Sequence, residues 1–217
     1  MIFAARLGLA AIVATVPFAA CAADPRSDAP EERVVAAAGV PTPASYDAAL
    51  RAWHGVDDVN AWIGASFRYD AARAMRLSES QRENTRMDIH RPDDLYAAPS
   101  GVCVDLARFG VETLRAIDPS AKPVYVMIEF APVVIAGSVL RRHWLVGIER
   151  DGRRYFFADS KRPGHLAGPY ASTRAFLDDY TAYRGREIVS FRELPSYERT
   201  TRTLAAKRVR EDREAAR

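Results

Sequence analysis

The dipeptide Asp151-Gly152 constrains the fold of this chain more than any other feature, because of what lies on either side of it. The flanking segments, 142–148 and 154–159, are rich in β-branched and aromatic residues. Asp-Gly between two such segments favours the tight turn that joins antiparallel strands. The sequence therefore predicts a β-hairpin in the carboxy-terminal half of the chain.

Helical patterns lie on both sides of this hairpin. Ser45 is a suitable N-cap for a short helix, Asp57 or Asp58 for a second helix, and Thr173 for a later one. Residues 71–94 are polar and rich in arginine, which favours a helix followed by an exposed loop. The apolar residues of the second helix recur at helical spacing and are expected to be buried. They are Val59, Trp62, Ile63 and Phe67.

A further helix is expected to start at Cys103 and to end at Asp118, because apolar residues recur there on one helical face. Gly110 lies within it and predicts a close packing contact, since glycine weakens a helix interior by about 1 kcal/mol relative to alanine. Strands are expected at 124–130 and 187–191. Helices first and antiparallel strands later predict an α+β domain.

The amino terminus has the pattern of an export signal. One charge, Arg6, precedes an apolar segment that is shorter than a transmembrane helix requires, so residues 1–22 are expected to be a signal peptide. Two cleavage sites compete. Phe-Ala-Ala-Cys ending at Cys21 resembles a lipobox, in which Cys21 is lipidated, whereas ordinary signal-peptidase cleavage would fall near Ala22 or Ala23. Both predict export, to the periplasm or as an outer-membrane lipoprotein.

Composition and charge indicate how the residues beyond the signal peptide are organised and which partners they exclude. Residues 23–43 are expected to form a flexible tether, 44–195 a single domain, and 196–217 a basic tail. Apolar residues at 48% and charged residues at 27% are ordinary values for a globular protein. The net charge is +3, and the positive excess lies mainly in the tail, so no nucleic-acid partner is expected. The membrane is expected to be contacted only through a lipid on Cys21.

Cysteine content singles out one residue. The chain has two cysteines, Cys21 and Cys103, and the first is either removed or lipidated, so the mature domain cannot form an internal disulfide. A lone cysteine in an exported protein is either a buried apolar residue or a reactive thiol. The start of a helix lowers the pKa of a thiol, and its backbone N–H groups can hold an oxyanion. Cys103 is therefore a candidate nucleophile whose own N–H is one oxyanion donor; the second donor is unassigned.

A thiol nucleophile requires a base and a group that orients the base. His143 begins the first arm of the predicted hairpin, and Asp159 ends the second. A strict two-residue turn pairs Arg150 with Arg153 and puts Asp159 on the face opposite His143, because side chains alternate along a strand. A three-residue loop pairs Arg150 with Arg154 instead, which brings His143 and Asp159 to one face. A Cys-His-Asp triad therefore predicts a bulged turn or a bulge within the hairpin.

The remaining candidate residues have simpler interpretations. His165, in a loop rich in proline and glycine, is the rival base. Asp105, two residues after Cys103, is expected to hold the local backbone, and His54 and His90 are expected to be exposed. One mature cysteine and scattered histidines give no metal-ligand spacing, and no phosphate-binding glycine pattern occurs, so neither metal nor cofactor is expected.

Three short segments, taken together and in this order, resemble the transglutaminase-like superfamily. Gly-Val-Cys-Val-Asp-Leu-Ala at 101–107 resembles its Gly-x-Cys-x-Asp-x-Ala nucleophile segment. His-Trp-Leu-Val at 143–146 resembles its histidine strand, and Tyr-Phe-Phe-Ala-Asp at 155–159 resembles its aspartate strand. The resemblance covers about 59–160, and it is nearest to bacterial transglutaminase-like cysteine proteases of the periplasm.

This resemblance implies a papain-like fold in which the nucleophile helix packs on a small antiparallel sheet. It also implies an exported thiol hydrolase that cleaves an amide or peptide bond in a protein or peptide substrate. Cys103 would attack the carbonyl, His143 would take and return the proton, and Asp159 would orient the imidazole. Val102 and Val104 stand where calcium-dependent relatives have acidic residues, so calcium dependence is not expected.

Two alternatives to a hydrolase remain open. The same chemistry transfers the acyl group when an amine replaces water, which would make the chain a protein-glutamine acyltransferase, that is, a transglutaminase. Transglutaminase-like domains can also lose activity, and the chain would then be a non-catalytic binding module of the cell envelope. The presence of all three triad residues favours an enzyme.

Overall fold

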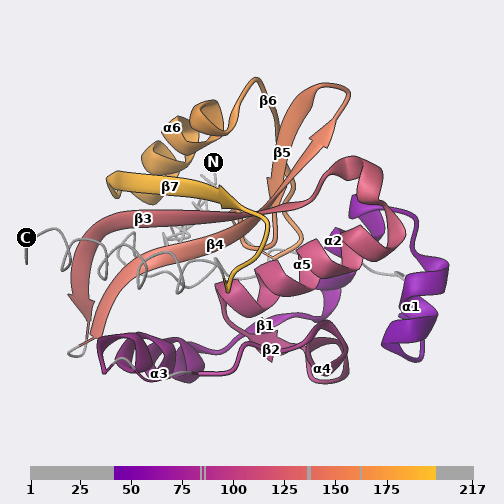
Figure 1. The fold of residues 1–217 in the computed structure, drawn as a ribbon, viewed down its shortest axis with the longest axis horizontal. Helices are drawn as coiled ribbons and strands as arrows, with labels where there is room; N and C mark the ends of the chain where they lie inside the picture. Colours follow the sequence, from indigo (N-terminus) through magenta and orange to yellow (C-terminus); the bar gives the residue numbers. More distant parts are fainter. Residues whose placement is uncertain (1–41, 84, 86, 136–137, 162, 199–217) are drawn as a thin grey trace, which may run out of the picture.

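The computed structural model describes residues 42–198 except 84, 86, 136–137 and 162 (Figure 1). The predicted signal segment with Cys21, nearly all of the predicted tether, and the tail beyond residue 198 lie outside the described residues.

The described part of the chain is a mixed helix and sheet structure, and the predicted α+β class is confirmed (Figure 1). The helices are α1 (Tyr46–Ala52), α2 (Val56–Ser66), α3 (Ala71–Arg82), α4 (Pro92–Ala97), α5 (Cys103–Ile117), the 3₁₀ helix η1 (Pro119–Ala121) and α6 (Thr173–Arg184). The strands are β1 (Arg68–Tyr69), β2 (Ser100–Gly101), β3 (Val124–Ile135), β4 (Ser138–Arg150), β5 (Arg153–Phe157), β6 (Ala167–Tyr170) and β7 (Ile188–Leu194).

Five strands form an antiparallel sheet in the order β6-β5-β4-β3-β7. The predicted Asp-Gly turn joins β4 to β5, with φ of 52° at Asp151 and 68° at Gly152. Both values lie in the left-handed region that a two-residue hairpin turn requires. Arg150 pairs with Arg153, and the register of β4 and β5 runs without a shift to the pair Val146 and Phe157. The turn is therefore strict, and neither the bulged turn nor a bulge within the paired strands, the two predicted alternatives, is present.

Helices cover both faces of this sheet. In Figure 1, α6 lies above the strands, and α5 with the amino-terminal helices lies below them. The first core cluster is formed by α1, α2, α4 and α5 against one face, and it includes Trp62, Phe109, Trp144 and Val146. The second core cluster lies between the other face and α6, and it includes Val126, Leu145, Phe156, Phe176 and Tyr180. The sheet is therefore the middle of three layers.

Helix α5 begins at Cys103 and ends at Ile117, as the sequence predicted. Its predicted apolar face is buried against β4 and the amino-terminal helices: Val104, Ala107, Val111 and Leu114 are each 4% exposed or less. The close contact predicted at Gly110 is confirmed, because an added Cβ would lie 2.8 Å from Val146 Cγ2 and 3.2 Å from the Phe157 ring. Glycine thus lets α5 approach β4 closely.

Some predicted helix caps are wrong by one or more residues. Gly55, not Asp57 or Asp58, precedes α2, and the Asp58 carboxylate instead accepts a hydrogen bond from the backbone of His54. Ser172 caps α6 in place of Thr173. The cap depends on which hydroxyl or carboxylate reaches an open N–H, and neighbouring polar residues compete for that position.

Five short elements were not predicted, namely α4, β6, β1, β2 and η1. Helix α4 starts with Pro92 at its first turn, inside a segment expected to be a loop. Strand β6 pairs with β5 at the edge of the sheet. Both are short and are stabilised by packing, which local sequence patterns do not report. Within the described residues, no helix has the length and apolar character needed to cross a membrane.

Candidate active site

Cys103 lies at the junction of the small β1–β2 sheet and α5. Strand β2 pairs in parallel with β1, Tyr69 opposite Gly101, and this pairing fixes the backbone just before the helix. Cys103 is the first residue of α5, carries a thiol that is not in a disulfide, and is 7% exposed. The first N–H groups of a helix have no acceptor within that helix, so the thiol stands in a partly positive environment.

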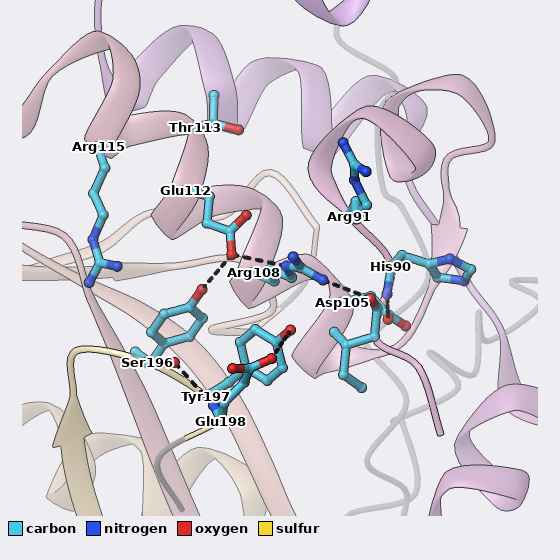
Figure 2. Close-up of polar contacts among 12 residues, drawn as sticks. His90, Arg91, Asp105, Arg108, Glu112, Thr113, Arg115, Ser196, Tyr197 and Glu198 are labelled. Atoms are coloured by element: carbon cyan, nitrogen blue, oxygen red, sulfur yellow. Dashed lines mark hydrogen bonds and ion pairs between the residues drawn. The ribbon is translucent and has the colours of Figure 1, made fainter. Parts of the chain in front are cut away.

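Asp105 holds this junction together, which confirms the structural role expected for it. Its carboxylate accepts a hydrogen bond from the backbone N–H of Val102 at 2.9 Å. It accepts another from the backbone N–H of His90 at 2.8 Å (Figure 2). The side chain of Arg73, on α3, donates to both carboxylate oxygens. The sequence did not single out Arg73, because it is one of many arginines in a polar segment.

His143 and Asp159 lie together, as the triad hypothesis requires. Both are buried, at 0% and 1% exposure. The Nε2 atom of His143 lies 3.0 Å from the backbone oxygen of Asp159 and 3.9 Å from its carboxylate Oδ2. Strand β5 ends at Phe157, and Ala158 and Asp159 then take φ values of 57° and 77°. This left-handed kink, rather than a bulged turn, brings Asp159 back to His143.

The surroundings of His143 keep its imidazole neutral. The ring lies 5.9 Å from the Tyr180 ring in a stacked arrangement and 6.4 Å from the Phe130 ring. Burial, together with the positive charges of Arg184 and Arg186, lowers the pKa of His143 to about 3. A carbonyl oxygen only accepts a hydrogen bond, so Nε2 carries the proton and Nδ1 carries the lone pair of a base.

Cys103 and His143 belong to different layers, so the predicted triad is not assembled in this conformation. Cys103 is part of the first core cluster, whereas the His143 ring contacts Phe130 and Tyr180 of the second. On β4, Trp144 points to the α5 face, so its neighbour His143 points to the α6 face. Within the described residues, Nδ1 of His143 has no hydrogen-bond partner, so the thiol–imidazole bond is not formed.

The rival base, His165, lies in the loop that follows Asp159. Its Nδ1 lies 3.0 Å from the hydroxyl of the fully buried Ser160, and that hydroxyl also donates to the His165 carbonyl. The loop is held to α2 by the Asn60 side chain, which donates to the Gly164 carbonyl at 3.0 Å. His165 is half-buried and is tied to Ser160.

A second polar cluster lies further along α5 (Figure 2). Arg108 donates to Glu112 at 2.9 Å, and its guanidinium lies over the Tyr197 ring at 5.2 Å. Tyr125 and Tyr197 pack edge to face, with ring centroids 5.9 Å apart. Burial raises the pKa of Tyr125 above its usual range. These contacts hold residues 195–198 against α5.

An open cavity of about 590 Å³ adjoins the same helix. It is lined by Tyr46, Asp47, Arg91, Pro92, Asp93, Arg108 and Glu112. Arg91 pairs with Asp93 at 3.1 Å, and Arg108 pairs with Glu112 at 2.9 Å, so both arginines that line the cavity are paired within it. The cavity is separate from Cys103 and from the residues predicted to act with it.

Among the described residues, no group of three or more histidine, cysteine, aspartate or glutamate side chains is arranged to hold a metal ion. A scan of the chain against protein-family models and a search of curated proteins found no match.

Proposed function

We propose that this chain is an exported thiol hydrolase of the transglutaminase-like type, with a papain-like fold, that cleaves an amide or peptide bond through Cys103. The observation that carries the proposal is the buried pair formed by His143 and Asp159, in the same molecule as a cysteine at the first residue of a helix. A buried imidazole with a free lone pair and an oriented N–H is costly to maintain unless it has a role.

The local chemistry at Cys103 supports a nucleophile. A thiolate at the start of α5 is stabilised by the N–H groups and dipole of the helix. The same N–H groups suit the oxyanion that forms when sulfur attacks a carbonyl. In that step the carbon–sulfur bond forms while the carbonyl electrons move to oxygen, and the amine then leaves with a proton from the base. Water releases the acyl group from Cys103 in a second step.

His143 supplies the base in this proposal through Nδ1. A pKa of about 3 keeps the imidazole neutral near pH 7 but makes it a weak base where it lies, so accepting the thiol proton requires His143 to leave this buried environment. The proton transfer requires Nδ1 and the Cys103 sulfur to come within about 3–3.5 Å. Because the backbone of β4 separates the two faces of the sheet, we propose that β4 rearranges at His143 and turns the ring toward α5, and that the chain populates this state before substrate binds.

A non-catalytic envelope module is the second candidate, and one observation favours it. The His143 ring is packed between Phe130 and Tyr180 on the face of the sheet that is opposite α5. A histidine that stays there has only a structural role, and Cys103 is then a core thiol. The two candidates differ in whether His143 influences the reactivity of Cys103.

The test is the rate at which iodoacetamide alkylates Cys103, followed by mass spectrometry of the peptide that contains it. The hydrolase proposal expects the rate to fall on the order of 100-fold in His143→Ala, since a positioned base contributes roughly that factor or more. His165→Ala is the matched control and is expected to leave the rate within about twofold. Equal and slow rates in the parent chain and His143→Ala would reject the hydrolase in favour of the binding module. A fall confined to His165→Ala would move the role of base to His165.

A further inference from the structure

Asp105 is a fully buried carboxylate in the first turn of α5, with 0% exposure. It accepts four hydrogen bonds from three separate segments of the chain. Arg73 donates through Nε at 2.7 Å and through Nη2 at 2.8 Å, in the two-pronged geometry that gives strong pairing. The backbone N–H groups of His90 and Val102 complete the set.

The Arg73 side chain is almost as buried as its partner. Its exposure is 11%, and its Nη2 also donates to the Asp88 carbonyl at 2.6 Å. Removing one member of a buried ion pair leaves the other charge uncompensated. The positive charge of Arg73 therefore compensates the negative charge of Asp105, which lies in the same helical turn as Cys103.

Gly101 shows how closely this carboxylate is fitted to the nucleophile segment. An added Cβ at residue 101 would lie 3.0 Å from Asp105 Oδ2 and 3.1 Å from Asp105 Cβ. These separations are shorter than ordinary contacts, so glycine lets the chain pass directly over the carboxylate. Asp105 then fixes the N–H of Val102, the residue immediately before Cys103.

We propose that Arg73 and Asp105 form a positioning pair for Cys103. The carboxylate sets the backbone where α5 begins, and the guanidinium neutralises that carboxylate in the first turn of the helix. The proposal rests on the proposed function only in taking Cys103 as the nucleophile. Neither side chain contacts substrate in this scheme, so both act through Cys103 and its backbone.

A pair that acts on the thiol electrostatically has a signature that a purely structural pair lacks. Asp105→Asn keeps the size of the side chain and leaves the Arg73 charge uncompensated, which favours the thiolate. Arg73→Gln leaves the Asp105 charge uncompensated, which disfavours the thiolate. Both variants lose stability, but they move the ionisation of Cys103 in opposite directions.

The other charged groups near this junction remain unchanged in each variant. Asp70 caps α3 through Arg73 N, and its own N–H donates to the Gly101 carbonyl at 2.8 Å. Arg76 lies 3.9 Å from the Asp70 carboxylate. His90 enters the junction through its backbone N–H.

The experiment measures the alkylation rate of Cys103 against pH in the full chain. Its readout is the midpoint, the pH at which the rate is half of its maximum. We expect a shift on the order of one pH unit downward in Asp105→Asn and upward in Arg73→Gln. The double variant should return close to the parent value. Arg73→Lys should keep that value while lowering thermal stability, because lysine retains the charge but not the two-pronged geometry.

Arg154→Gln is the matched control, since it removes another arginine–carboxylate pair, the one with Glu193, without touching this junction. It should leave the midpoint unchanged. Unchanged midpoints in both single variants, or shifts in the same direction, would overturn the proposal and leave the pair a structural role. If Arg73→Gln does not fold, a downward shift in Asp105→Asn with an unshifted Arg73→Lys supports the proposal, and any other combination overturns it.

The pH midpoints test the positioning pair independently of the alkylation rate of His143→Ala, which tests the hydrolase proposal. A midpoint that moves as expected while His143→Ala alkylates as fast as the parent chain would retain the positioning pair and reject the hydrolase. The reverse pattern would retain the hydrolase and reject the pair.

Discussion

The Nε2 atom of His143 lies closer to the backbone oxygen of Asp159, at 3.0 Å, than to its carboxylate Oδ2, at 3.9 Å. The main chain at residue 159 therefore orients the imidazole. That main chain takes φ of 77°, in the left-handed region. The conformation at this residue matters more to the histidine than the charge of its side chain.

Asp159→Asn tests this arrangement directly. Asparagine retains the backbone acceptor and tolerates left-handed φ, so the orientation of His143 should persist. We expect the alkylation rate of Cys103 to fall less than about tenfold, against the roughly 100-fold fall expected for His143→Ala. Asp159→Val is the contrasting variant, because a β-branched residue is strained at this φ, and its rate should fall as far as that of His143→Ala. If Asp159→Asn matched that large fall, the carboxylate would be the orienting group.

The stability of the fold should depend on pH through His143. Its pKa is about 3 in the folded chain and about 6.5 as an ordinary value, so between these pH values the unfolded chain binds the extra proton. The stabilisation from the neutral imidazole is fully present above pH 6.5 and is lost as pH falls toward 3. Its size is on the order of 3–5 kcal/mol.

Urea unfolding between pH 7.5 and pH 4 measures this loss. His143→Gln cannot titrate and should have a flatter dependence of unfolding free energy on pH than the parent chain. His54 is exposed, and His54→Gln should retain the parent slope. A parent slope that survives in His143→Gln would assign the acid sensitivity to other groups.

Gly110→Ala should destabilise the domain although alanine is the better helix former. The new Cβ would lie 2.8 Å from Val146 Cγ2, and a valine side chain on a strand has little freedom to move. Overpacking of this kind costs about 1–3 kcal/mol, which exceeds the gain of about 1 kcal/mol in helix propensity. Combining Gly110→Ala with Val146→Ala should cost less than the sum of the two single changes in chemical denaturation. Additive costs would show that the two positions do not clash.

Tyr197→Ala should loosen the segment that follows β7. The substitution removes the ring that packs on Arg108 and on Tyr125. A loss of about 1–2 kcal/mol in unfolding free energy is expected, typical of an exposed cation–π contact combined with an aromatic pair. Tyr197→Phe retains the ring and should remain close to the parent chain. An equal loss in both variants would assign the effect to the hydroxyl.

Local signals were sufficient for much of the architecture. The Asp151-Gly152 turn forms as its residue types demand, and α5 starts at the predicted residue because its apolar spacing begins there. The register beyond the turn was harder to predict. Whether β5 continues past Phe157 or kinks depends on the neighbouring strand and loop, and the kink at Ala158 and Asp159 has no signal in the residue types.

The candidate site divides in the same way. The position of Cys103 at a helix start, and the role of Asp105 in holding the local backbone, were both predicted from short-range spacing. Arg73 was missed because its partner is distant in sequence, and no pattern distinguishes a buried arginine from those that are exposed. A buried ion pair of this kind can be found only when the packing of α3 on α5 is known.

The sequence alone determined that this chain has an α+β domain, a helix beginning at Cys103 and a tight hairpin after His143, because each depends on neighbouring residues. The tertiary structure decided that His143 contacts Asp159 and points toward α6 rather than toward Cys103. The physical reason is that the side chains of a strand alternate between two faces, and only packing decides which helix covers each face.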